Sequence, residues 1–313
     1  MEPVIQVSEL VKRYRKAERN AVDGVSFAVE PGSFFALLGP NGAGKTTTIS
    51  VLTTTLRPTS GQLRVAGHDL LREPDAVRRQ LGIIFQKPSL DLNLTAEENV
   101  RLHAVLYGLY PMRPAYRLMP AGYRAQVQHL AEVLGIAGEM SQPVRTFSGG
   151  MRRKLEIVRS LIHEPRVLFL DEPTTGLDPA SRRDLWAYLK AVRQRGGTTV
   201  FLTTHYIEEA EAADRICVIH RGRVVSLGST DEVKADLVED YVSIDAEDGA
   251  ALAAELEGLG ARFAPDPELG GFRVAVKGAG IHPLLAAVRT PLTRVRTHTP
   301  TLEEAYLEIL ERS

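Results

Sequence analysis

At 313 residues the chain has room for about two domains, each able to bury its own core. Its 38 lysines and arginines balance 39 aspartates and glutamates, so the charge gives no indication of a nucleic-acid partner. The single cysteine, Cys217, excludes an internal disulfide and fits a reducing compartment. No apolar run approaches the ~18 residues of a membrane span, and the N-terminus does not resemble a signal peptide. The sequence therefore predicts a soluble, cytoplasmic chain.

Two short apolar segments near the N-terminus, Val4–Val7 and Val25–Val29, are expected to be strands of a small antiparallel sheet. Between them lies Tyr14, whose ring could stack on an adenine because an aromatic face binds any base. An ordinary half-buried strand tyrosine is the alternative. The motif that follows favours stacking.

Residues 39–46 read Gly-Pro-Asn-Gly-Ala-Gly-Lys-Thr and match the phosphate-binding pattern G-x-x-x-x-G-K-[ST]. A buried strand is expected before the motif and a helix after it, so that backbone amides and the helix N-terminus surround an anion. Lys45 can reach the β- and γ-phosphates of a nucleotide, and the Thr46 hydroxyl can ligate Mg²⁺. The β-branched run Thr46–Ile49 prefers strand locally, and we expect tertiary context to override this preference. A chance glycine-rich turn is the alternative. The candidate phosphate-binding residues are Gly39, Pro40, Asn41, Gly42, Ala43, Gly44, Lys45, Thr46 and Thr47.

Two further strands are expected, at Gly61–Gly67 and Leu81–Gln86. Ligands of open α/β sheets lie at the carboxyl ends of strands, so Gln86 could reach a metal ion or an attacking water. A simple polar cap of the strand end explains Gln86 equally well.

Residues 94–140 change to a helical pattern. Thr95 and Glu98 form a capping-box start, and helical periodicity resumes from Gln126 to Leu134. The prolines between these segments predict an irregular, non-helical stretch within a helical lobe. They are Pro111, Pro114 and Pro120.

Ser148-Gly149-Gly150 precedes a helix whose apolar face contains Met151, Leu155, Val158 and Ile162. Ser148 is placed as the N-cap, and the two glycines would expose amides as a second anion site. In isolation, a plain Ser/Gly cap is the alternative interpretation.

The segment Val167–Glu172 is expected to be a buried parallel strand that ends in two carboxylates. Because an unpaired buried carboxylate is costly, Asp171 is predicted to hold Mg²⁺ and Glu172 to orient or deprotonate the attacking water. Capping of the next loop is the alternative, and the phosphate-binding motif disfavours it.

The loop Gly176–Pro179 leads to a predicted helix from Ala180 to about Arg195. The strand Thr198–Thr204 then places His205 at its end, where a γ-phosphate would lie. Ile216–Ile219 and Arg223–Leu227 should close the sheet as a hairpin around Gly222.

From about Gly228 the pattern is that of a small α+β domain. Strands are expected at Tyr241–Ile244 and Phe272–Val276, with a helix at Ala250–Leu259 between them. A capped final helix from Thr301 would present one face made of Leu302, Ala305, Tyr306 and Ile309. We therefore predict domains at residues 1–228 and 229–313, with the helical lobe at about 87–165.

Together these motifs resemble an ABC-type ATPase subunit over residues 3–230. The resemblance implies an α/β P-loop NTPase fold with an antiparallel β subdomain and a helical lobe, plus the small C-terminal α+β domain. It implies ATP and Mg²⁺ as cofactors and a head-to-tail pair of subunits that sandwiches two ATP molecules. Each site would take its loop from one chain and Ser148–Gly150 from the other. The remaining roles implied are catalytic for Glu172, His205 and Gln86, metal-binding for Thr46, Gln86 and Asp171, and nucleotide-binding for Tyr14 and Asp178.

Three softer motifs resemble the drug-resistance branch of exporters, which includes daunorubicin-resistance ATPases: Ser148–Arg153, Thr204–Ala210 and Pro300–Tyr306. Met151 stands where many family members have glutamine, and Phe147 where leucine is common. This resemblance implies export of a drug-like, lipid or polysaccharide substrate through separate membrane-spanning subunits, at the cytoplasmic face of the cell membrane. The alternatives are a soluble ABC-type ATPase acting on ribosomes or DNA, and an importer ATPase.

Overall fold

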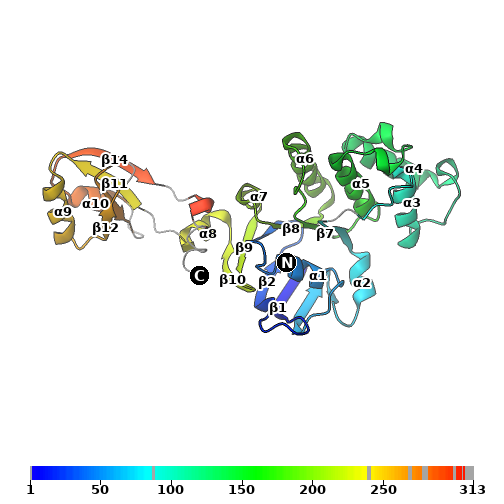
Figure 1. Ribbon diagram of the computed structural model, residues 1–313, viewed down its shortest axis with the longest axis horizontal. Coiled ribbons are helices and arrows are strands. Elements are labelled where there is room, and N and C mark those ends of the chain that lie inside the picture. Colours follow the sequence, from blue (N-terminus) through cyan, green and yellow to red (C-terminus); the bar gives the residue numbers. More distant parts are fainter. Residues whose placement is uncertain are drawn as a thin grey trace. The chain divides into compact units, whose positions relative to one another are not determined.

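The computed structural model of the protein describes residues 2–86, 89–237, 241–266, 270–276, 281–298, 301–304 and 306. The residues divide into two compact units, Met1–Leu227 and Gly228–Ser313. Figure 1 traces the elements of both units.

The first unit contains an antiparallel sheet with the order β2-β1-β4-β5. Its strands are β1 (Ile5–Lys12), β2 (Val22–Val29), β4 (Ser60–Val65) and β5 (His68–Asp69). The predicted antiparallel sheet is confirmed, although β1 is longer than expected. A bulge around Glu9, whose φ is 50°, returns Leu10 to the buried face and lets the strand continue.

A six-stranded sheet with the order β10-β9-β3-β8-β7-β6 forms the centre of this unit. Its strands are β3 (Phe34–Leu38), β6 (Leu81–Ile84), β7 (Val167–Asp171), β8 (Thr199–Thr204), β9 (Arg215–His220) and β10 (Arg223–Gly228). β3 pairs in parallel with β8 and β9, and β7 with β6 and β8. The strands β3, β7 and β8 are buried along their whole length. Because these three strands are parallel, their carboxyl ends lie at one edge of the sheet.

The helices of the first unit are α1 (Lys45–Leu52), α2 (Pro74–Arg79), α3 (Ala96–Leu106), α4 (Ala121–Val133), α5 (Gly149–Leu161), α6 (Pro179–Gly196) and α7 (Ile207–Glu211). Figure 1 shows α3, α4 and α5 gathered into a helical lobe. Three single-turn 3₁₀ helices accompany them, η1 (Tyr116–Leu118), η2 (Ala137–Glu139) and η3 (Val144–Thr146).

Local signals account for most helix boundaries. α1 is helical despite its threonines, as expected from the loop that precedes it. Thr95 and Glu98 form the predicted capping box, and the Ser148 hydroxyl accepts a hydrogen bond from the Met151 amide as the predicted N-cap of α5. α4 begins well before the predicted Gln126, directly after Pro120, because proline is compatible with a helix start.

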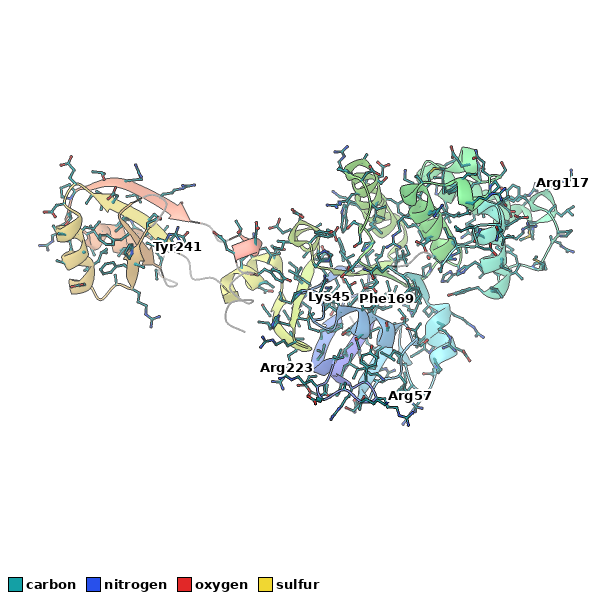
Figure 2. The ribbon with its side chains drawn as sticks, viewed as in Figure 1. Lys45, Arg57, Arg117, Phe169, Arg223 and Tyr241 are labelled. Atoms are coloured by element: carbon teal, nitrogen blue, oxygen red, sulfur yellow. The ribbon has the colours of Figure 1, made fainter. Side chains whose placement is uncertain are left out.

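An aromatic cluster lies in the core between the two sheets. Phe201 lies 5.2 Å from Phe35, 5.2 Å from Phe169 and 5.9 Å from Phe27, measured between ring centroids. Figure 2 shows Phe169 among the packed side chains of this unit.

The second unit contains α8 (Thr230–Leu237), α9 (Gly249–Gly258) and α10 (Ile281–Ala287) with an antiparallel sheet of order β12-β13-β11-β14. The strands are β11 (Tyr241–Ala246), β12 (Phe263–Pro265), β13 (Phe272–Ala275) and β14 (Leu292–His298). Val242, Ile244, Leu252, Leu256 and Val274 form its buried core.

Several elements of the second unit have no counterpart in the prediction. β12 and α10 are short, and β14 interleaves arginines with apolar residues, so none carries a strong periodic signal. Leu302 and Tyr306 are helical and buried, while the predicted partners Ala305 and Ile309 lie outside the described residues. The α/β fold class with antiparallel and helical subdomains and a small α+β unit is confirmed.

Replacing Phe201 by alanine is expected to lower the free energy of unfolding by about 3–5 kcal/mol, because a cavity would remain among three aromatic rings. Chemical denaturation followed by circular dichroism measures the change. Val225→Ala on β10 is the control, since Val225 is 45% exposed and its loss should change stability by no more than about 0.5 kcal/mol. Similar small changes for both variants would contradict this account of the core.

Candidate functional site

The predicted phosphate-binding loop connects the end of β3 to the start of α1, at the carboxyl edge of the central sheet. It borders a cavity of about 340 Å³. The lining residues are Ala21, Asn41, Gly42, Gly44, Lys45, Thr46, Thr47, Gln86 and Glu172. The structure thus brings together residues that are separated by more than a hundred positions in the chain.

Two glycines of the loop are required by its geometry. Gly44, with φ of 107°, lies so close to the preceding chain that a Cβ atom would meet the Ala21 carbonyl oxygen at 2.6 Å. A Cβ atom on Gly39 would overlap the carbonyl oxygen of Ile219. The close approach allows the loop to curl against its neighbours.

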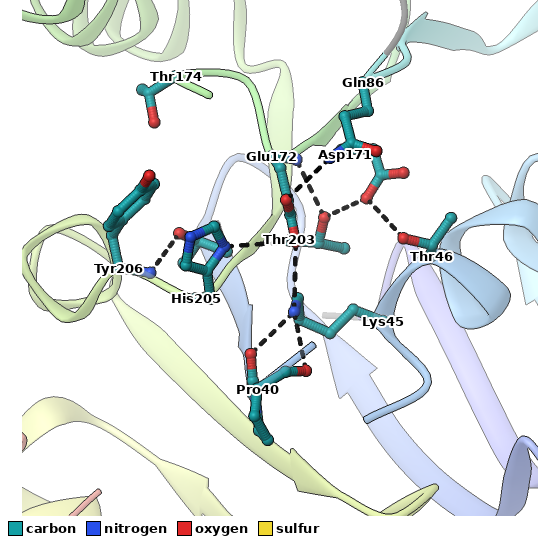
Figure 3. Close-up of polar contacts among 12 residues, drawn as sticks. Pro40, Lys45, Thr46, Gln86, Asp171, Glu172, Thr174, Thr203, His205 and Tyr206 are labelled. Atoms are coloured by element: carbon teal, nitrogen blue, oxygen red, sulfur yellow. Dashed lines mark hydrogen bonds and ion pairs between the residues drawn. The ribbon is translucent and has the colours of Figure 1, made fainter. Parts of the chain in front are cut away.

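Lys45 lies at the base of the loop with only 4% of its side chain exposed. Its Nζ donates to the carbonyl oxygens of Gly39 at 2.8 Å and Pro40 at 3.1 Å, and lies 3.3 Å from Glu172 Oε1 (Figure 3). Burial lowers the pKa of Lys45, and the neighbouring Glu172 carboxylate opposes this shift. A buried ammonium with a single close carboxylate is a suitable partner for an additional anion.

Asp171 ends β7 and faces two hydroxyl groups. Asp171 Oδ1 accepts a hydrogen bond from Thr203 Oγ1 at 2.5 Å and another from Thr46 Oγ1 at 3.4 Å. Burial raises the pKa of Asp171, and the hydrogen bond from Thr203 opposes the shift. Thr203 also accepts a hydrogen bond from the Glu172 amide at 3.2 Å. The sequence prediction missed this residue, although a threonine in the buried strand before His205 was the available signal.

Glu172 is the residue on which the predicted catalytic groups converge. Gln86 Nε2 donates to Glu172 Oε2 at 3.1 Å, so the segment after β6 is hydrogen-bonded to the carboxylate that follows β7. His205 Nδ1 lies 3.4 Å from Glu172 Oε1, without a hydrogen bond. Figure 3 shows Gln86, His205 and Lys45 approaching Glu172 from different directions. Glu172 has φ of 45°, a left-handed conformation that costs about 1–3 kcal/mol in a non-glycine residue.

Other predicted residues do not line this cavity. Ser148 and Gly149 are exposed at the start of α5, and Asp178 is the N-cap of α6, where it accepts bonds from the Ala180 and Ser181 amides at 3.0 Å. Tyr14 is partly exposed, and its hydroxyl lies 3.3 Å from Thr47 Oγ1 beside the loop. Stacking of Tyr14 on a base stays a prediction.

A larger cavity of about 540 Å³ lies at the opposite, N-terminal ends of the strands, where its lining includes Arg166, Thr198 and Thr199. It lacks the converging carboxylates, ammonium and loop amides of the smaller cavity. Since ligands of open parallel sheets bind at the carboxyl ends of strands, the smaller cavity is the candidate site.

The donors around the smaller cavity suit Mg²⁺, a hard cation that prefers oxygen ligands. Thr46 supplies a hydroxyl, Asp171 a buried carboxylate and Gln86 an amide oxygen. Among the described residues no three His, Cys, Asp or Glu side chains gather into a metal site. These residues therefore fit an ion that takes its remaining ligands from nucleotide phosphates and water.

The family model described as ABC transporter matches residues 22–175. Over 97% of this chain and 92% of the relative, the sequence is 39% identical to the daunorubicin/doxorubicin resistance ATP-binding protein DrrA of Streptomyces peucetius. The chain belongs to the family of ABC transporter ATP-binding proteins. It is an ATP-binding protein of the ATPase class, and the predicted resemblance to the drug-resistance branch is confirmed.

Two further matches extend over most of the chain. The Nod factor export ATP-binding protein I of Ralstonia nicotianae is 36% identical over 99% of this chain and 94% of the relative. A solved structure described as the ATP-binding subunit of an ABC transporter is 32% identical, with a TM-score of 0.65 over 74% of this chain and 92% of that chain. Within the described residues, no helix is both long and apolar enough to cross a membrane.

Replacing Lys45 by alanine is expected to weaken ATP binding by about 10- to 100-fold, because hydrogen bonds to charged groups contribute about 1.5–3 kcal/mol. Titration with a fluorescent ATP analogue measures the affinity. Lys154→Ala is the matched control, since Lys154 does not line the cavity. Its Nζ forms an ion pair with Asp184 Oδ2 at 3.0 Å. Unchanged affinity of Lys45→Ala would overturn the phosphate-loop assignment.

Proposed function

We propose that this chain is the ATP-hydrolysing subunit of an exporter for a drug-like, lipid or polysaccharide substrate. The convergence of Lys45, Gln86 and His205 on the Glu172 carboxylate, beside a phosphate-binding loop, carries the hydrolytic part of the proposal. The relatives named for daunorubicin resistance and Nod factor export support the direction and substrate class.

In the proposed reaction, the loop amides and Lys45 bind the β- and γ-phosphates. Lys45 is poised for this role because it is buried and already directed toward the loop by the carbonyls of Gly39 and Pro40. Thr46, Asp171 and Gln86 would hold Mg²⁺, which supplies screening of the phosphate charge when bound.

Glu172 accepts the proton of the attacking water in this proposal, and Gln86 and His205 hold the Glu172 carboxylate in place. One oxygen of its carboxylate already accepts a bond from Gln86 and the other faces Lys45. When Lys45 bonds to phosphate, Oε1 loses part of its attraction to the ammonium and becomes available to water. His205 lies beside this oxygen, where it can contact the γ-phosphate or the water.

The second half of each nucleotide site is proposed to come from a second copy of the chain. Ser148 and Gly149 are exposed at the N-terminus of α5, a helix of 13 residues. In this proposal their amides and the helix dipole face the γ-phosphate of a nucleotide bound to the second copy. In this proposal Asp178 lies at the same junction, because its carboxylate holds Ser181, against which Gly150 packs. The second unit is proposed to be an accessory or regulatory domain.

Membrane-spanning permease subunits are the proposed partners of the helical lobe, at the cytoplasmic face of the membrane. Between positions 102 and 118 the lobe exposes five large apolar side chains, those of Leu102, Leu106, Leu109, Met112 and Leu118. Leu106 is 75% exposed. Arg117, which is labelled in Figure 2, belongs to the same segment of the lobe. A contiguous exposed apolar patch is typical of a binding surface, and in this proposal these side chains contribute to one.

Replacing Glu172 by glutamine is expected to preserve ATP binding, to accumulate an ATP-bound dimer and to lower turnover by about 100- to 10,000-fold. Phosphate release measures turnover, and size-exclusion chromatography with ATP detects the dimer. Glu208→Gln is the control, since Glu208 is exposed on α7 outside the cavity. Undiminished turnover would remove Glu172 as the base.

The double change Leu106→Asp with Met112→Asp is expected to reduce recovery of a permease at least about tenfold, because burying each such side chain contributes about 1.5–3 kcal/mol. The measurement is affinity purification of the chain from detergent-solubilised membranes of its host, with partners identified by mass spectrometry. Leu71→Asp, at a position 46% exposed elsewhere in the first unit, is the matched control.

The same purification of the unchanged chain tests the proposed function. A multi-span membrane protein in stoichiometric amount supports it, and the class of that protein separates an exporter from an importer. Recovery of ribosomal or DNA-associated proteins without any membrane protein would overturn the proposal in favour of a soluble ABC-type ATPase.

A further inference from the structure

A buried guanidinium outside the cavity contacts the backbone next to two of its residues. Arg153, on α5, is only 7% exposed. Its Nε donates to the Pro173 carbonyl at 2.9 Å, and its Nη1 donates to the Phe85 carbonyl at 2.7 Å. Pro173 directly follows Glu172, and Phe85 directly precedes Gln86. One side chain therefore fixes the backbone beside each member of the Gln86–Glu172 hydrogen bond.

The charge of Arg153 is balanced by Glu156, which is 1% exposed. Arg153 Nη1 lies 3.0 Å from Glu156 Oε2, and Glu156 Oε1 accepts the Ser89 amide at 3.0 Å. Buried ions persist only when they are paired and hydrogen-bonded, and both conditions are met here. Glu156 thus holds the arginine in place and itself contacts the chain beyond Gln86.

A second arginine of α5 contacts the same stretch. Arg159 donates from Nη1 to the Ser89 carbonyl at 2.7 Å and from Nη2 to the Ser89 hydroxyl at 2.5 Å. Both Phe85 and Ser89, on either side of Gln86, are therefore held by one helix. The same helix begins at the exposed Ser148 and Gly149.

We propose that Arg153 is a positioning residue for ATP hydrolysis, which sets the geometry of the Gln86–Glu172 pair and ties both residues to α5. This inference rests on the proposed roles of Gln86 and Glu172. It makes α5 the rigid link between the exposed Ser148–Gly150 amides and the hydrolytic carboxylate. Arg153 itself does not line the cavity.

The role requires arginine rather than a cation in general. Its two bonds to carbonyls leave from different nitrogens of a planar, rigid group, whereas lysine carries its donors on one nitrogen atom. Lysine can keep the charge opposite Glu156 but cannot reproduce the fixed spacing between the Phe85 and Pro173 carbonyls. Arg153→Lys therefore separates positioning from charge balance.

The first experiment measures kcat, ATP affinity and Tm of Arg153→Lys in the full chain. We expect kcat to fall by about 10- to 100-fold, as for a misplacement of catalytic groups by roughly 1 Å, with ATP affinity unchanged. Arg152→Lys is the matched control on the same helix, because Arg152 bonds to the Arg145 carbonyl and contacts neither Phe85 nor Pro173. A kcat of Arg153→Lys equal to that of the control would overturn the proposal.

A neutral double variant, Arg153→Gln with Glu156→Gln, keeps the measurement possible if the lysine variant fails to fold. It leaves no unpaired buried charge, and one amide cannot hold both carbonyls. We expect a similar fall in kcat at unchanged ATP affinity. Wild-type kcat in this variant would likewise overturn the proposal.

A double-mutant cycle between Arg153→Lys and Gln86→Ala distinguishes positioning from a general loss of stability. If Arg153 acts through the Gln86–Glu172 pair, the two fold-changes in kcat should combine to far less than their product. Multiplicative effects would contradict the link. Glu172→Gln, measured alongside, separates the two proposals. Full turnover in that variant defeats the proposed function, whereas its loss together with an unaffected Arg153→Lys defeats only this inference.

Discussion

Parallel pairing of fully buried strands is the constraint on which the site depends. Because β3 and β7 both pair in parallel with β8, the chain leaves Leu38, Asp171 and Thr204 at one edge of the sheet. The three segments that follow these strand ends carry the phosphate-binding loop, Glu172 and His205. Residues 39, 172 and 205 are distant in sequence, and the parallel register brings them to the same edge of the sheet. The apolar run of each strand therefore has two roles, since it forms the core and also aligns the polar residues at the strand ends.

Burial then determines how these polar residues are used. Lys45 and Asp171 are both buried, and burial alone would favour their neutral forms. Each has a partner that offsets this penalty: the Glu172 carboxylate for Lys45 and the Thr203 hydroxyl for Asp171. The low-dielectric setting strengthens every charge interaction made there, including those with an entering phosphate. The contacts that stabilise these buried charges therefore also hold them in position for a phosphate.

The sequence predicted much of this arrangement, for identifiable reasons. The motif at residues 39–46 and the apolar strand ending at Asp171 each have a strong local pattern, and each pattern is typical of one structural setting. The sequence therefore predicts the fold class together with several residues that line the cavity. Thr203 was missed because a threonine in a strand carries no sign of its partner until β7 and β8 are paired. A basic triplet such as Arg152–Lys154 is typical of a solvated helix face, but the Arg153 guanidinium is buried against Phe85 and Pro173, segments that only the tertiary fold brings to α5. In the second unit, short strands such as β12 lack enough residues for a periodic signal.

Met151 stands where many family members have glutamine, and the contacts of its backbone indicate what this difference changes. The Met151 amide, not its side chain, donates to the Ser148 hydroxyl at 3.2 Å and completes the N-cap of α5. Gly149 is exposed and has open space where a side chain would be. Anion binding at a helix N-terminus depends on such amides and on the helix dipole. A methionine therefore removes only polar contacts of a side chain, while the groups that would face a phosphate belong to the main chain and to Ser148.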